Sequence, residues 1–565
     1  MVVPMPKRYV VIGGVAAGPK AAARARRLDP DAEITIIEKE EILSYAGCGL
    51  PYWISGLVKD RNTLISTPVG VLRDPQFFAK AKDIKAMNRT EATEIDRERK
   101  EVVCRSLETG EVSRVPYDKL VIATGSRPFD LPIPGADLKK VLHLKDPDDA
   151  SQLRDAISVG CRKVAIVGGG LIGCEMTEAV SECGKQVTII EMLPHILPGM
   201  LDEEMALILE KNLKQQGVTI QTNTRVERLE GNDGGEVAKV ITSDGIEIDT
   251  EFVLMAVGVR PVTELAQKAG LEIGEKRGIK VNSRMQTSDP DIYAAGDCIE
   301  HPLTLTQETS LWPMGSVANK EGRIAGTNMT GGEEEFAGIV KTNVVKVFDQ
   351  NVGRTGLTEV GAIEKGYDVT TAIVASPDRA HYYPGAAPIV MKAIADTNTR
   401  KLLGLQGIGK GDVVKRVDIA STAIFAGMTV DHVANLDLAY APPYSSAMDP
   451  LIVLANILRN KLDGLFEGIT PTDVKEKMDR GEDFFFLDVR GQPEYDTIRI
   501  PGATLIPLGA LRGRLDEVPR DREVITFCKI SLRGYEAARI LHGKGYENVK
   551  VMEGGVLAWP FETES

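Results

Sequence analysis

Two distant stretches of the chain share one pattern of hydrophobic and polar positions. Each has an apolar run, a glycine-rich turn, a helix-like segment and a second apolar run that ends in an acid, over residues 9–38 and residues 163–191. Near-continuous apolar runs are typical of parallel strands that are buried on both faces. Strand, glycine turn, helix and strand in this order are typical of a βαβ unit that binds a dinucleotide. We therefore predict two such units.

The glycine spacing differs between the two turns. The second turn fits the full G-x-G-x-x-G pattern, which falls on Gly168, Gly170 and Gly173. Small residues at these positions let a pyrophosphate approach the backbone and the helix N-terminus. The first turn has Gly13 and Gly18, but Val15 occupies the middle position. The first turn is therefore compatible with dinucleotide binding and also with a plain strand-to-helix connection.

Each second strand ends in an acid, Glu38 in the first unit and Glu191 in the second. An acid at this position accepts hydrogen bonds from the ribose 2′-hydroxyl of a dinucleotide. Met192 and Leu193 follow Glu191 and no arginine lies nearby, which favours NADH because NADPH carries a 2′-phosphate. The alternative is that both acids are solvated side chains at strand ends.

The rest of the chain predicts further domains. Residues 331–449 mix strand-like and helix-like runs, residues 451–462 predict a helix, and a new α/β pattern begins at residue 470. The length of 565 residues corresponds to roughly four domains. We expect an α/β protein with two Rossmann-like dinucleotide-binding domains, an α+β domain and a C-terminal α/β domain.

Composition and charge exclude several classes of protein. The chain has 68 basic and 81 acidic residues, a formal net charge of −13, which is too acidic for a general binder of nucleic acid or anionic membranes. It has no apolar run of about 18 residues, so we expect no membrane insertion. A strand-like segment begins by residues 7–9 and leaves no room for a secretory signal. We expect a cytoplasmic protein.

Cysteine and histidine spacing argues against metal sites and structural disulfides. The seven cysteines contain no C-x-x-C pair, and the six histidines are scattered. Neither a zinc site nor a disulfide framework is therefore predicted.

Two further segments carry a family resemblance. Residues 117–128 include Thr124 and Gly125, and residues 292–297 end in Gly296 and Asp297. Together with the glycine turns they resemble the signatures of the pyridine nucleotide–disulfide oxidoreductases, in which this aspartate contacts the ribityl chain of FAD. The resemblance implies FAD on the first unit, NADH on the second, and a homodimer with shared active sites.

The resemblance also implies site residues and domain boundaries. The implied cofactor-binding residues are Gly13, Gly14, Ala16, Ala17, Gly18, Glu38, Lys39, Thr124, Gly125, Gly168, Gly170, Gly173, Glu191, Gly258, Gly296 and Asp297. The predicted domains are FAD-binding at residues 7–130 and 251–328, NADH-binding at 131–250, dimerisation at 329–450, a linker at 451–466 and a C-terminal domain at 467–565.

Within that family, residues 44–52, 381–385 and 440–444 resemble coenzyme A–disulfide reductase and relatives that reduce CoA persulfide or polysulfide. The resemblance implies that Cys48 is the redox group, with a buried structural cysteine as the alternative. Reductases with an internal dithiol have a second cysteine five positions later, but this chain has Trp53 there. A lone thiol must be oxidised to a mixed disulfide with a small thiol or to a sulfenic acid. Many family members have asparagine where this chain has Gly47, a departure that bears on substrate specificity.

A single redox cysteine is compatible with two chemistries, disulfide or persulfide reduction and peroxide or oxygen reduction. The resembling NADH peroxidases and oxidases carry a histidine in the first glycine turn that faces the cysteine, and this chain has Ala16 at the matching place. Ala16 disfavours oxidase or peroxidase activity as the main function. An oxidase or peroxidase with a redox-sensing tail remains the alternative, and a sulfur carrier with a poorly active flavin domain is a second one.

The resemblance extends to the CoA site. It implies that Arg27 and Arg61 hold the phosphates of CoA, which guanidinium groups suit, and that Ser44 lines the thiol end. An exposed basic helix face is the alternative for the arginines. It further implies that two tyrosines reach the thiol site from the partner subunit and donate a proton to the leaving thiolate. Tyr382 and Tyr440 fit these places best, and Tyr383 and Tyr444 are the alternatives.

The C-terminal pattern resembles a rhodanese domain over residues 484–490, 500–503 and 524–534. Cys528 directly follows a buried strand, and the loop from it to Arg533 is expected to surround it with backbone N–H groups that stabilise a thiolate or persulfide. Arg499 replaces the histidine that usually precedes Ile-Pro-Gly-Ala. We expect sulfur transfer by Cys528, with an inert docking module as the alternative.

These features combine into one hypothesis. We expect an FAD-dependent, NADH-using homodimer that reduces CoA persulfide, CoA disulfide or polysulfide through Cys48, while Cys528 carries sulfane sulfur as a persulfide. Joining the two domains raises the effective concentration of the shared intermediate. The order of preference among these substrates stays open.

Overall fold

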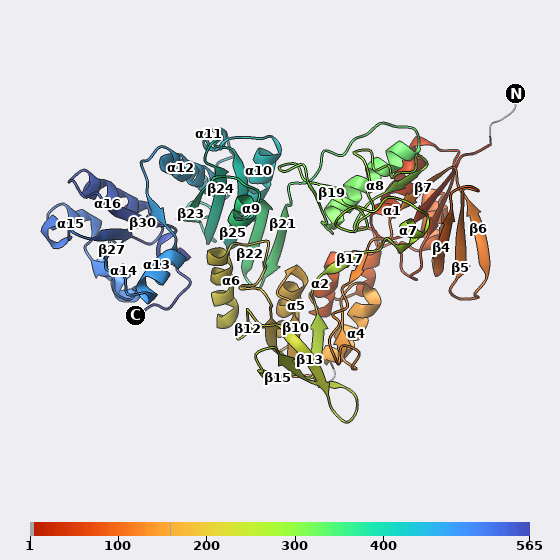
Figure 1. Cartoon of the computed structure of the whole chain (residues 1–565), viewed down its shortest axis with the longest axis horizontal. Coiled ribbons are helices and arrows are strands. Elements are labelled where there is room, and N and C mark those ends of the chain that lie inside the picture. The colour runs from red at the N-terminus through yellow and green to blue at the C-terminus, as the bar shows by residue number, and fades with distance from the viewer. Residues whose placement is uncertain (1–4, 159, 565) are drawn as a thin grey trace. The chain divides into compact units, whose positions relative to one another are not determined.

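The computed structural model describes residues 5–158 and 160–564. Its internal contacts divide the chain into two units. The first unit runs to residue 168 and includes residues 176–187 and 226–339. The second contains residues 169–175 and 188–225 together with the chain from residue 340 onward. Figure 1 labels the elements of both units.

The first unit is built on a parallel sheet with strand order β18-β7-β1-β2-β3. Its strands are β1 (Arg8–Ile12), β2 (Glu33–Ile37), β3 (Lys85–Met87), β7 (Lys119–Ile122) and β18 (Ile292–Ala294). Helix α1 (Ala17–Leu28) connects β1 to β2 and buries its small residues, including Ala21, Ala22 and Ala25. The first βαβ unit predicted from the apolar pattern is therefore confirmed.

Helix α8 (Gly315–Met329) packs against α1 at very short range. A Cβ on Gly322 would lie 2.3 Å from the carbonyl oxygen of Ala17, and one on Gly326 would lie 2.4 Å from that of Ala21. These two glycines, one helical turn apart, let the backbones of α1 and α8 nearly touch. The contact also fixes the start of α1, where the first glycine turn ends.

The first unit has smaller elements around this sheet. Strands β4 (Thr90–Asp96), β5 (Glu101–Ser106) and β6 (Val112–Pro116) form an antiparallel sheet. Two short antiparallel pairs join β8 (Ser126–Pro128) to β17 (Val259–Pro261) and β19 (His301–Pro302) to β20 (Thr309–Ser310). The remaining helical segments are η1 (Gly47–Gly49), α2 (Leu50–Ile54), η2 (Arg61–Ile65), α3 (Pro75–Lys82), α4 (Pro147–Ser158) and α7 (Glu264–Lys268).

The second βαβ pattern also folds as predicted. Strand β16 (Phe252–Met255) pairs in parallel with β10 (Lys163–Val167) and β9 (Val141–Leu142), and β11 (Gln186–Ile190) pairs in parallel with β12 (Thr219–Gln221). Helix α5 (Leu171–Glu182) connects β10 to β11 along the chain, and α6 (Glu203–Gln215) follows β11. Strands β13 (Val226–Gly231), β14 (Val237–Thr242) and β15 (Glu247–Asp249) form an antiparallel sheet.

The chain from residue 340 onward begins with a five-stranded antiparallel sheet of order β21-β22-β25-β24-β23. These strands are β21 (Asn343–Val347), β22 (Gln350–Gly356), β23 (Val369–Pro377), β24 (Pro388–Asp396) and β25 (Leu402–Gly409). The helices of this α+β region are α9 (Glu359–Glu364), α10 (Val414–Phe425), α11 (Val430–Ala434) and α12 (Pro450–Leu462). Helix α12, which the sequence predicts, buries Leu451, Leu454 and Leu458.

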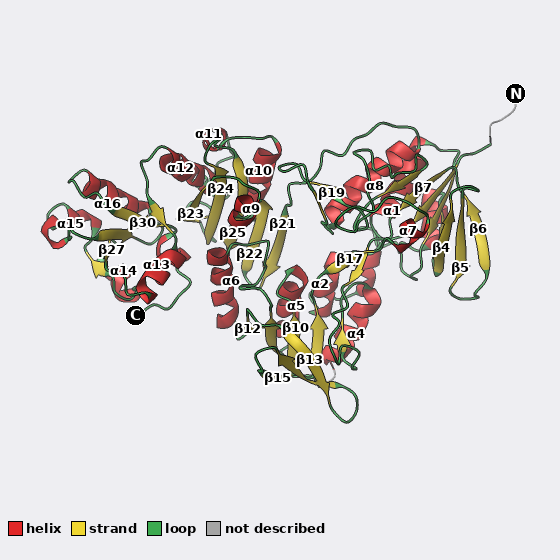
Figure 2. Ribbon diagram, viewed as in Figure 1, coloured by secondary structure: helices red, strands yellow, loops and turns green. Residues whose placement is uncertain are grey.

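The C-terminal region is a parallel sheet of order β26-β30-β29-β27-β28 with helices around it (Figure 2). Its strands are β26 (Gly468–Ile469), β27 (Phe484–Asp488), β28 (Thr504–Leu505), β29 (Glu523–Phe527) and β30 (Val549–Met552). Its helical segments are α13 (Pro471–Asp479), α14 (Gln492–Thr497), α15 (Leu508–Leu511), η3 (Leu515–Glu517), α16 (Leu532–His542) and η4 (Gly555–Ala558). The expected fold class is therefore confirmed: an α/β protein with parallel sheets and one α+β region built on an antiparallel sheet.

Within the part of the chain that the structure describes, none of the helices has both the length and the apolar character needed to cross a membrane.

The close contact of α1 and α8 gives a first prediction. In Gly322→Ala the new Cβ must displace the backbone of Ala17, so we expect the free energy of unfolding to fall by about 1–3 kcal/mol and FAD to be released earlier in a urea titration followed by flavin fluorescence. Gly509→Ala is the control, because its Cβ would meet no atom within 4 Å. Equal stability of Gly322→Ala and wild type would contradict the packing argument.

Candidate active site

The first glycine turn has the geometry that a dinucleotide requires. Gly13 has φ of +111°, and a Cβ on it would lie 2.0 Å from the carbonyl oxygen of Ala123 at the end of β7. A Cβ on Gly18 would lie 1.9 Å from the carbonyl oxygen of Gly13. Both positions therefore exclude any side chain, and Val15 at the middle position does not prevent the turn. The sequence departure at Val15 leaves the two sterically required glycines in place.

The acid at the end of β2 is buried beside this turn. Glu38 is 6% exposed, and its two carboxylate oxygens accept hydrogen bonds from the backbone N–H groups of Gly14 at 2.6 Å and Glu40 at 2.9 Å. Burial raises the pKa of Glu38 despite these two donors. Lys39 is exposed and pairs with Glu40. A buried carboxylate at the glycine turn fits an acceptor for ribose hydroxyls.

The second glycine turn repeats this arrangement. Gly168 has φ of +105°, and its Cβ would lie 2.4 Å from the carbonyl oxygen of Ala256. Glu191 is 7% exposed and accepts hydrogen bonds from the N–H groups of Gly169 at 2.7 Å and Leu193 at 2.9 Å. A Cβ on Gly170 would meet no atom within 4 Å, so the second turn is open on the side where a pyrophosphate would bind.

The second turn continues into the first turn of α5, which contains Gly173. This is the helix N-terminus that the G-x-G-x-x-G pattern predicts.

A third segment meets the first glycine turn. A Cβ on Gly296 would lie 3.2 Å from the Cβ of Ala17, and the N–H of Gly296 donates to the buried carboxylate of Glu321 at 2.9 Å. The carboxylate of Asp297 accepts a hydrogen bond from the hydroxyl of Ser126 at 2.8 Å. Residues 124–125 and 296–297, which the resemblance assigns to FAD, are therefore brought together at the turn through Gly296 and through Ser126, the next residue in the chain.

The same segments are linked to residues that the sequence analysis missed. Lys145 donates to the hydroxyl of Ser126 at 3.0 Å and lies 3.8 Å from Asp297. The hydroxyl of Thr124 donates to the carbonyl oxygen of Val262. The N–H of Val262 donates to the carbonyl oxygen of Gly125. No local spacing signals Ser126 or Lys145, because both act through Asp297 far along the chain. Gly258 has φ of +99° and accepts a hydrogen bond from the N–H of Phe129.

Cys48 lies on a segment fixed to the first glycine turn. The N–H of Ser44 donates to the carbonyl oxygen of Gly14 at 2.8 Å, and the N–H of Ala46 donates to that of Leu64 at 2.9 Å. Cys48 is in η1, directly before α2. All seven cysteines lie in the described chain, none is in a disulfide, and Cys48 alone is classed as exposed. The buried alternative for Cys48 is therefore wrong, and its role as the redox group stays a prediction.

Position 53 holds an aromatic ring where an internal dithiol would need sulfur. Trp53 is 8% exposed, and the guanidinium of Arg154 lies 4.8 Å from the centre of its ring. The remaining cysteines are buried, apart from the half-buried Cys183. The geometry at Cys48 therefore agrees with redox chemistry at one thiol.

The arginines predicted near CoA lie in different settings. Arg61 donates to the hydroxyl of Ser151 at 3.0 Å and lies 3.9 Å from Asp148. Arg27 is exposed in the last turn of α1. Arg73, which the sequence analysis missed, donates to the carbonyl oxygen of Ser44 at 2.6 Å. CoA binding by Arg27, Arg61 and Ser44 stays a prediction.

The tyrosines predicted for the thiol site lie in the second unit. Tyr382, on the connection between β23 and β24, is 66% exposed, and Tyr440, after α11, is 54% exposed. The rings of His381 and Tyr382 meet edge to face at 5.5 Å. Exposure leaves both tyrosines free to meet a second subunit, and their role there stays a prediction.

The second candidate thiol has the opposite setting. Cys528 follows β29 and is completely buried. None of the backbone N–H groups of residues 529–534 donates to another atom of the described chain. Ser531 has φ of +81°, a left-handed conformation that shapes this loop. Unused N–H groups in a loop that follows a cysteine suit the binding of an anion such as a thiolate or persulfide, and a cradle around Cys528 stays a prediction.

Arg533 closes this loop through an acid that the sequence analysis missed. Its guanidinium donates to both carboxylate oxygens of Glu494, at 2.7 and 2.8 Å, and it lies close enough to Cys528 for the two groups to interact electrostatically. Arg533 lowers the pKa of Glu494 to about 2. The ion pair therefore persists throughout the physiological pH range and holds the guanidinium beside the thiol.

The family is established by comparison. Residues 7–322 match the model of the pyridine nucleotide-disulphide oxidoreductases, residues 342–452 match their dimerisation domain, and residues 470–561 match the rhodanese-like domain. The chain therefore belongs to the pyridine nucleotide-disulphide oxidoreductase family and carries a rhodanese-like domain. The predicted family, fold and oxidoreductase class are confirmed.

Several relatives are similar to this chain over most of its length. A solved NAD-dependent persulfide reductase from A. fulgidus is similar over 98% of this chain and 100% of its own, with 45% identity and a TM-score of 0.94. Reduced CoADR-RHD from Bacillus anthracis covers 98% of both chains, with 35% identity and a TM-score of 0.90. The NAD(P)H coenzyme A polysulfide/persulfide reductase of Pyrococcus horikoshii is 38% identical over 80% of this chain and 99% of its own. Relatives named NADH oxidase match as well.

The buried acid at the first turn gives a prediction for FAD. Glu38→Ala leaves the N–H groups of Gly14 and Glu40 without their acceptor, and each such loss costs about 1–3 kcal/mol. We expect FAD affinity to fall at least about tenfold, measured as flavin retained per chain after gel filtration. Glu33→Ala, at the exposed start of β2, is the control. Full flavin content in Glu38→Ala would contradict the assignment.

The equivalent acid at the second turn gives a prediction for the nicotinamide cofactor. Glu191→Gln removes a negative charge that would repel the 2′-phosphate of NADPH, so the ratio of kcat/KM for NADPH to that for NADH should rise roughly tenfold. Steady-state kinetics with both cofactors measure this ratio. Glu203→Gln, an exposed acid on α6, should leave it unchanged. An unaltered ratio in Glu191→Gln would show that the 2′-position of the cofactor ribose does not bind at Glu191.

Proposed function

We propose that the chain is a homodimeric NADH-dependent reductase of CoA persulfide, CoA disulfide or polysulfide. The observation that carries this proposal is Cys48, an exposed thiol on a segment hydrogen-bonded to the first glycine turn, with Trp53 in place of a second cysteine. The names of the persulfide and CoA-dependent relatives support the same substrate class.

The cofactor sites fit the proposal on steric grounds. Gly13 and Gly168 leave room only for backbone, and Glu38 and Glu191 face the turns as buried acceptors. When bound, NADH would supply the two electrons that the reduction consumes, and FAD would carry them to the thiol site. We assign FAD to the first turn, together with Asp297 and its partner Ser126, and NADH to the second.

Cys48 performs the sulfur chemistry. Its thiolate attacks the carbon-bonded sulfur of CoA persulfide, the S–S bond breaks, and hydrogen sulfide leaves after taking up a proton. A mixed disulfide between Cys48 and CoA results, and its two-electron reduction restores both thiols. Overall, CoA persulfide, NADH and a proton yield CoA, hydrogen sulfide and NAD⁺. A disulfide substrate follows the same course with a thiol as the leaving group.

Further residues position the substrate in this proposal. Arg27 and Arg61 hold the phosphates of CoA, and Ser44 lines its thiol end. In the dimer, Tyr382 and Tyr440 approach Cys48 from the other subunit and donate a proton to the leaving thiolate. Their exposure is compatible with this role.

The rhodanese-like domain supplies sulfur. The Cys528 thiolate attacks the outer sulfur of thiosulfate or a sulfur of polysulfide, the S–S bond there breaks, and sulfite or a shorter polysulfide leaves. Cys528 then carries the sulfur as a persulfide in the cradle of N–H groups and passes it to the thiolate of CoA or Cys48, which restores the Cys528 thiolate. Arg533, held by Glu494, keeps a positive charge beside the sulfur.

The rival function is oxygen or peroxide reduction, as in the relatives named NADH oxidase. Those reactions need support for a sulfenate at the redox cysteine. Ala16 at the start of α1 has no titratable group and cannot give that support. Persulfide and disulfide reduction need no such group, because the substrate sulfur itself becomes the partner of Cys48.

Anaerobic NADH consumption tests the proposal with polysulfide, CoA persulfide and CoA disulfide in turn. We expect Cys48→Ser to lose at least about a hundredfold in rate with every acceptor, since the nucleophile is removed. Cys528→Ser should retain CoA disulfide reduction and lose turnover that begins with thiosulfate. Cys183→Ser, at the half-buried thiol, is the matched control. Full activity in Cys48→Ser, or NADH loss with oxygen alone, would replace the proposal with the oxidase function.

A further inference from the structure

One short segment of the rhodanese-like domain joins the Cys528 loop to the rest of the second unit. Residues 553–561, here called the docking segment, follow β30 and include η4. Gly554 and Gly555 near its start both have left-handed φ values, of +69° and +59°. Neither the family signatures nor the cofactor sites involve this segment.

The docking segment supports the Cys528 loop directly. The N–H of Val556 donates to the carbonyl oxygen of Cys528 at 3.0 Å, and that of Leu557 donates to Lys529 at 3.2 Å. A Cβ on Gly555 would lie 2.3 Å from the carbonyl oxygen of Cys528. The backbone of the loop therefore rests on the backbone of the segment, and displacement of one must displace the other.

The first anchor of the segment is Glu553. Its side chain is 2% exposed, and one carboxylate oxygen accepts the N–H of Ile373 in β23 at 2.7 Å. The other oxygen pairs with the ammonium of Lys461 in α12, which also donates to the carbonyl oxygen of Thr371 at 2.6 Å. Glu553 thus binds the edge strand of the antiparallel sheet through a buried, charge-assisted network. Such contacts are costly to break because they leave buried groups unpaired.

Two glycines leave room for the carboxylate of Glu553 beside strand β23. A Cβ on Gly468 would lie 1.9 Å from a carboxylate oxygen of Glu553, and one on Gly554 would lie 3.1 Å from the side chain of Ile373. Glycine at both positions lets the rhodanese-like domain approach β23 closely.

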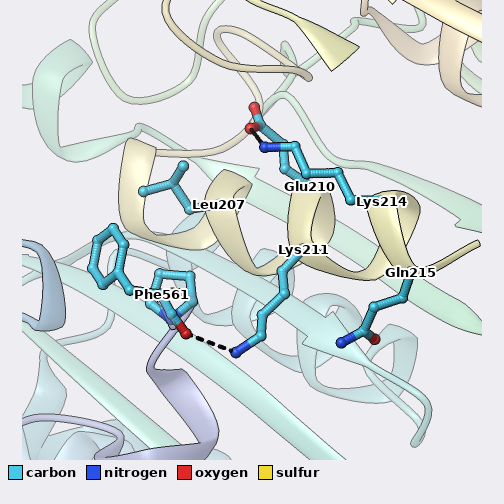
Figure 3. Close-up of a pocket in the computed structure, with 7 residues that line it drawn as sticks. Leu207, Glu210, Lys211, Lys214, Gln215 and Phe561 are labelled. Carbon is cyan, nitrogen blue, oxygen red and sulfur yellow. Dashed lines mark hydrogen bonds and ion pairs between the residues drawn. The ribbon is translucent and has the colours of Figure 1, made fainter. Parts of the chain in front are cut away.

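The second anchor lies at the other end of the segment. The ammonium of Lys211 in α6 donates to the carbonyl oxygens of Trp559 at 3.2 Å and Phe561 at 3.1 Å. Figure 3 shows Lys211 reaching from α6 to the backbone at Phe561. The contact borders a pocket of about 410 Å³ lined by Leu207, Glu210, Lys211, Lys214, Gln215, Pro560 and Phe561. Lys214 lines the same pocket, and its ammonium lies 3.8 Å from a carboxylate oxygen of Glu210.

We propose that Glu553 and Lys211 are positioning residues for sulfur transfer at Cys528. Each fixes one end of the docking segment to a different part of the second unit, and the stretch between them carries the Cys528 loop. The cradle of N–H groups therefore keeps its shape only while the rhodanese-like domain is docked. This inference rests on the proposed role of Cys528 as a sulfur carrier.

The test uses the full-length, FAD-loaded protein with Glu553→Gln and Lys211→Met. Thiosulfate as donor and cyanide as acceptor give the sulfur-transfer rate, and we expect kcat/KM for thiosulfate to fall about tenfold in each variant. The second readout is the pH profile of Cys528 alkylation by iodoacetamide, followed on the Cys528 peptide by mass spectrometry. A distorted cradle should change this profile, because the surroundings of the sulfur change with the loop. A loss of stability alone would leave the pH profile in place.

Matched control variants distinguish an effect of lost docking from an effect of a lost charge. Lys214→Met removes an ammonium from the same helix and pocket, and Glu562→Gln removes the exposed charge next to the segment. Both should match wild type within about twofold in both readouts. NADH-dependent reduction of CoA disulfide through Cys48 should also stay within that range in all four variants, which verifies that the flavin part is folded.

The outcomes for the two proposals are distinct. If wild type and Cys528→Ser transfer sulfur equally, the sulfur-carrier role fails, and the alkylation profile alone decides the positioning role. If wild type transfers sulfur through Cys528 while Glu553→Gln and Lys211→Met match it in both readouts, the positioning role is wrong. If Lys214→Met or Glu562→Gln shows the same losses, docking is not the cause, and the proposal is equally overturned.

Discussion

At each dinucleotide turn, a glycine with positive φ packs against an alanine carbonyl at the end of a neighbouring strand, Gly13 against Ala123 and Gly168 against Ala256. Any side chain there would overlap that carbonyl. The N–H of the residue after each glycine donates to a buried carboxylate. Burial of that carboxylate without a hydrogen-bond donor would cost free energy. Turn, strand end and acid therefore hold one another in place. At the first turn this arrangement also anchors the Cys48 segment and receives the Ala-Gly-Asp turn.

The two thiols that matter for the proposed chemistry lie in opposite surroundings. Cys48 is exposed on a short turn attached to the first glycine turn, where a substrate can reach it. Cys528 is completely buried, with unused N–H groups and Arg533 around it. An exposed thiol suits attack on a large substrate such as CoA. A buried thiol limits the contact of a labile persulfide with water, so the two settings suit different steps of the proposed chemistry.

The rhodanese-like domain is part of the second unit and does not form a separate unit of its own. Strand β23 is the edge of a five-stranded sheet, and an unpaired edge exposes backbone donors to unwanted partners. Glu553 accepts one of these donors, that of Ile373, while Lys461 and Lys211 bind backbone carbonyls on either side. Docking therefore satisfies polar groups on both partners and fixes the segment under the Cys528 loop.

The sequence by itself determined the features that depend on local pattern. Apolar periodicity and glycine spacing predicted both βαβ units, and single motifs predicted Cys48, Cys528 and Arg533, because strands, turns and nucleophile loops are set by residues close together in the chain. Only the tertiary structure decided which side chains contact these segments from elsewhere in the chain, namely Ser126, Lys145, Arg73, Glu494, Glu553 and Lys211. Ser126 meets Asp297 and Glu553 meets Ile373 across 171 and 180 positions. No spacing along the chain encodes such a meeting, since it exists only once strands have paired and domains have packed.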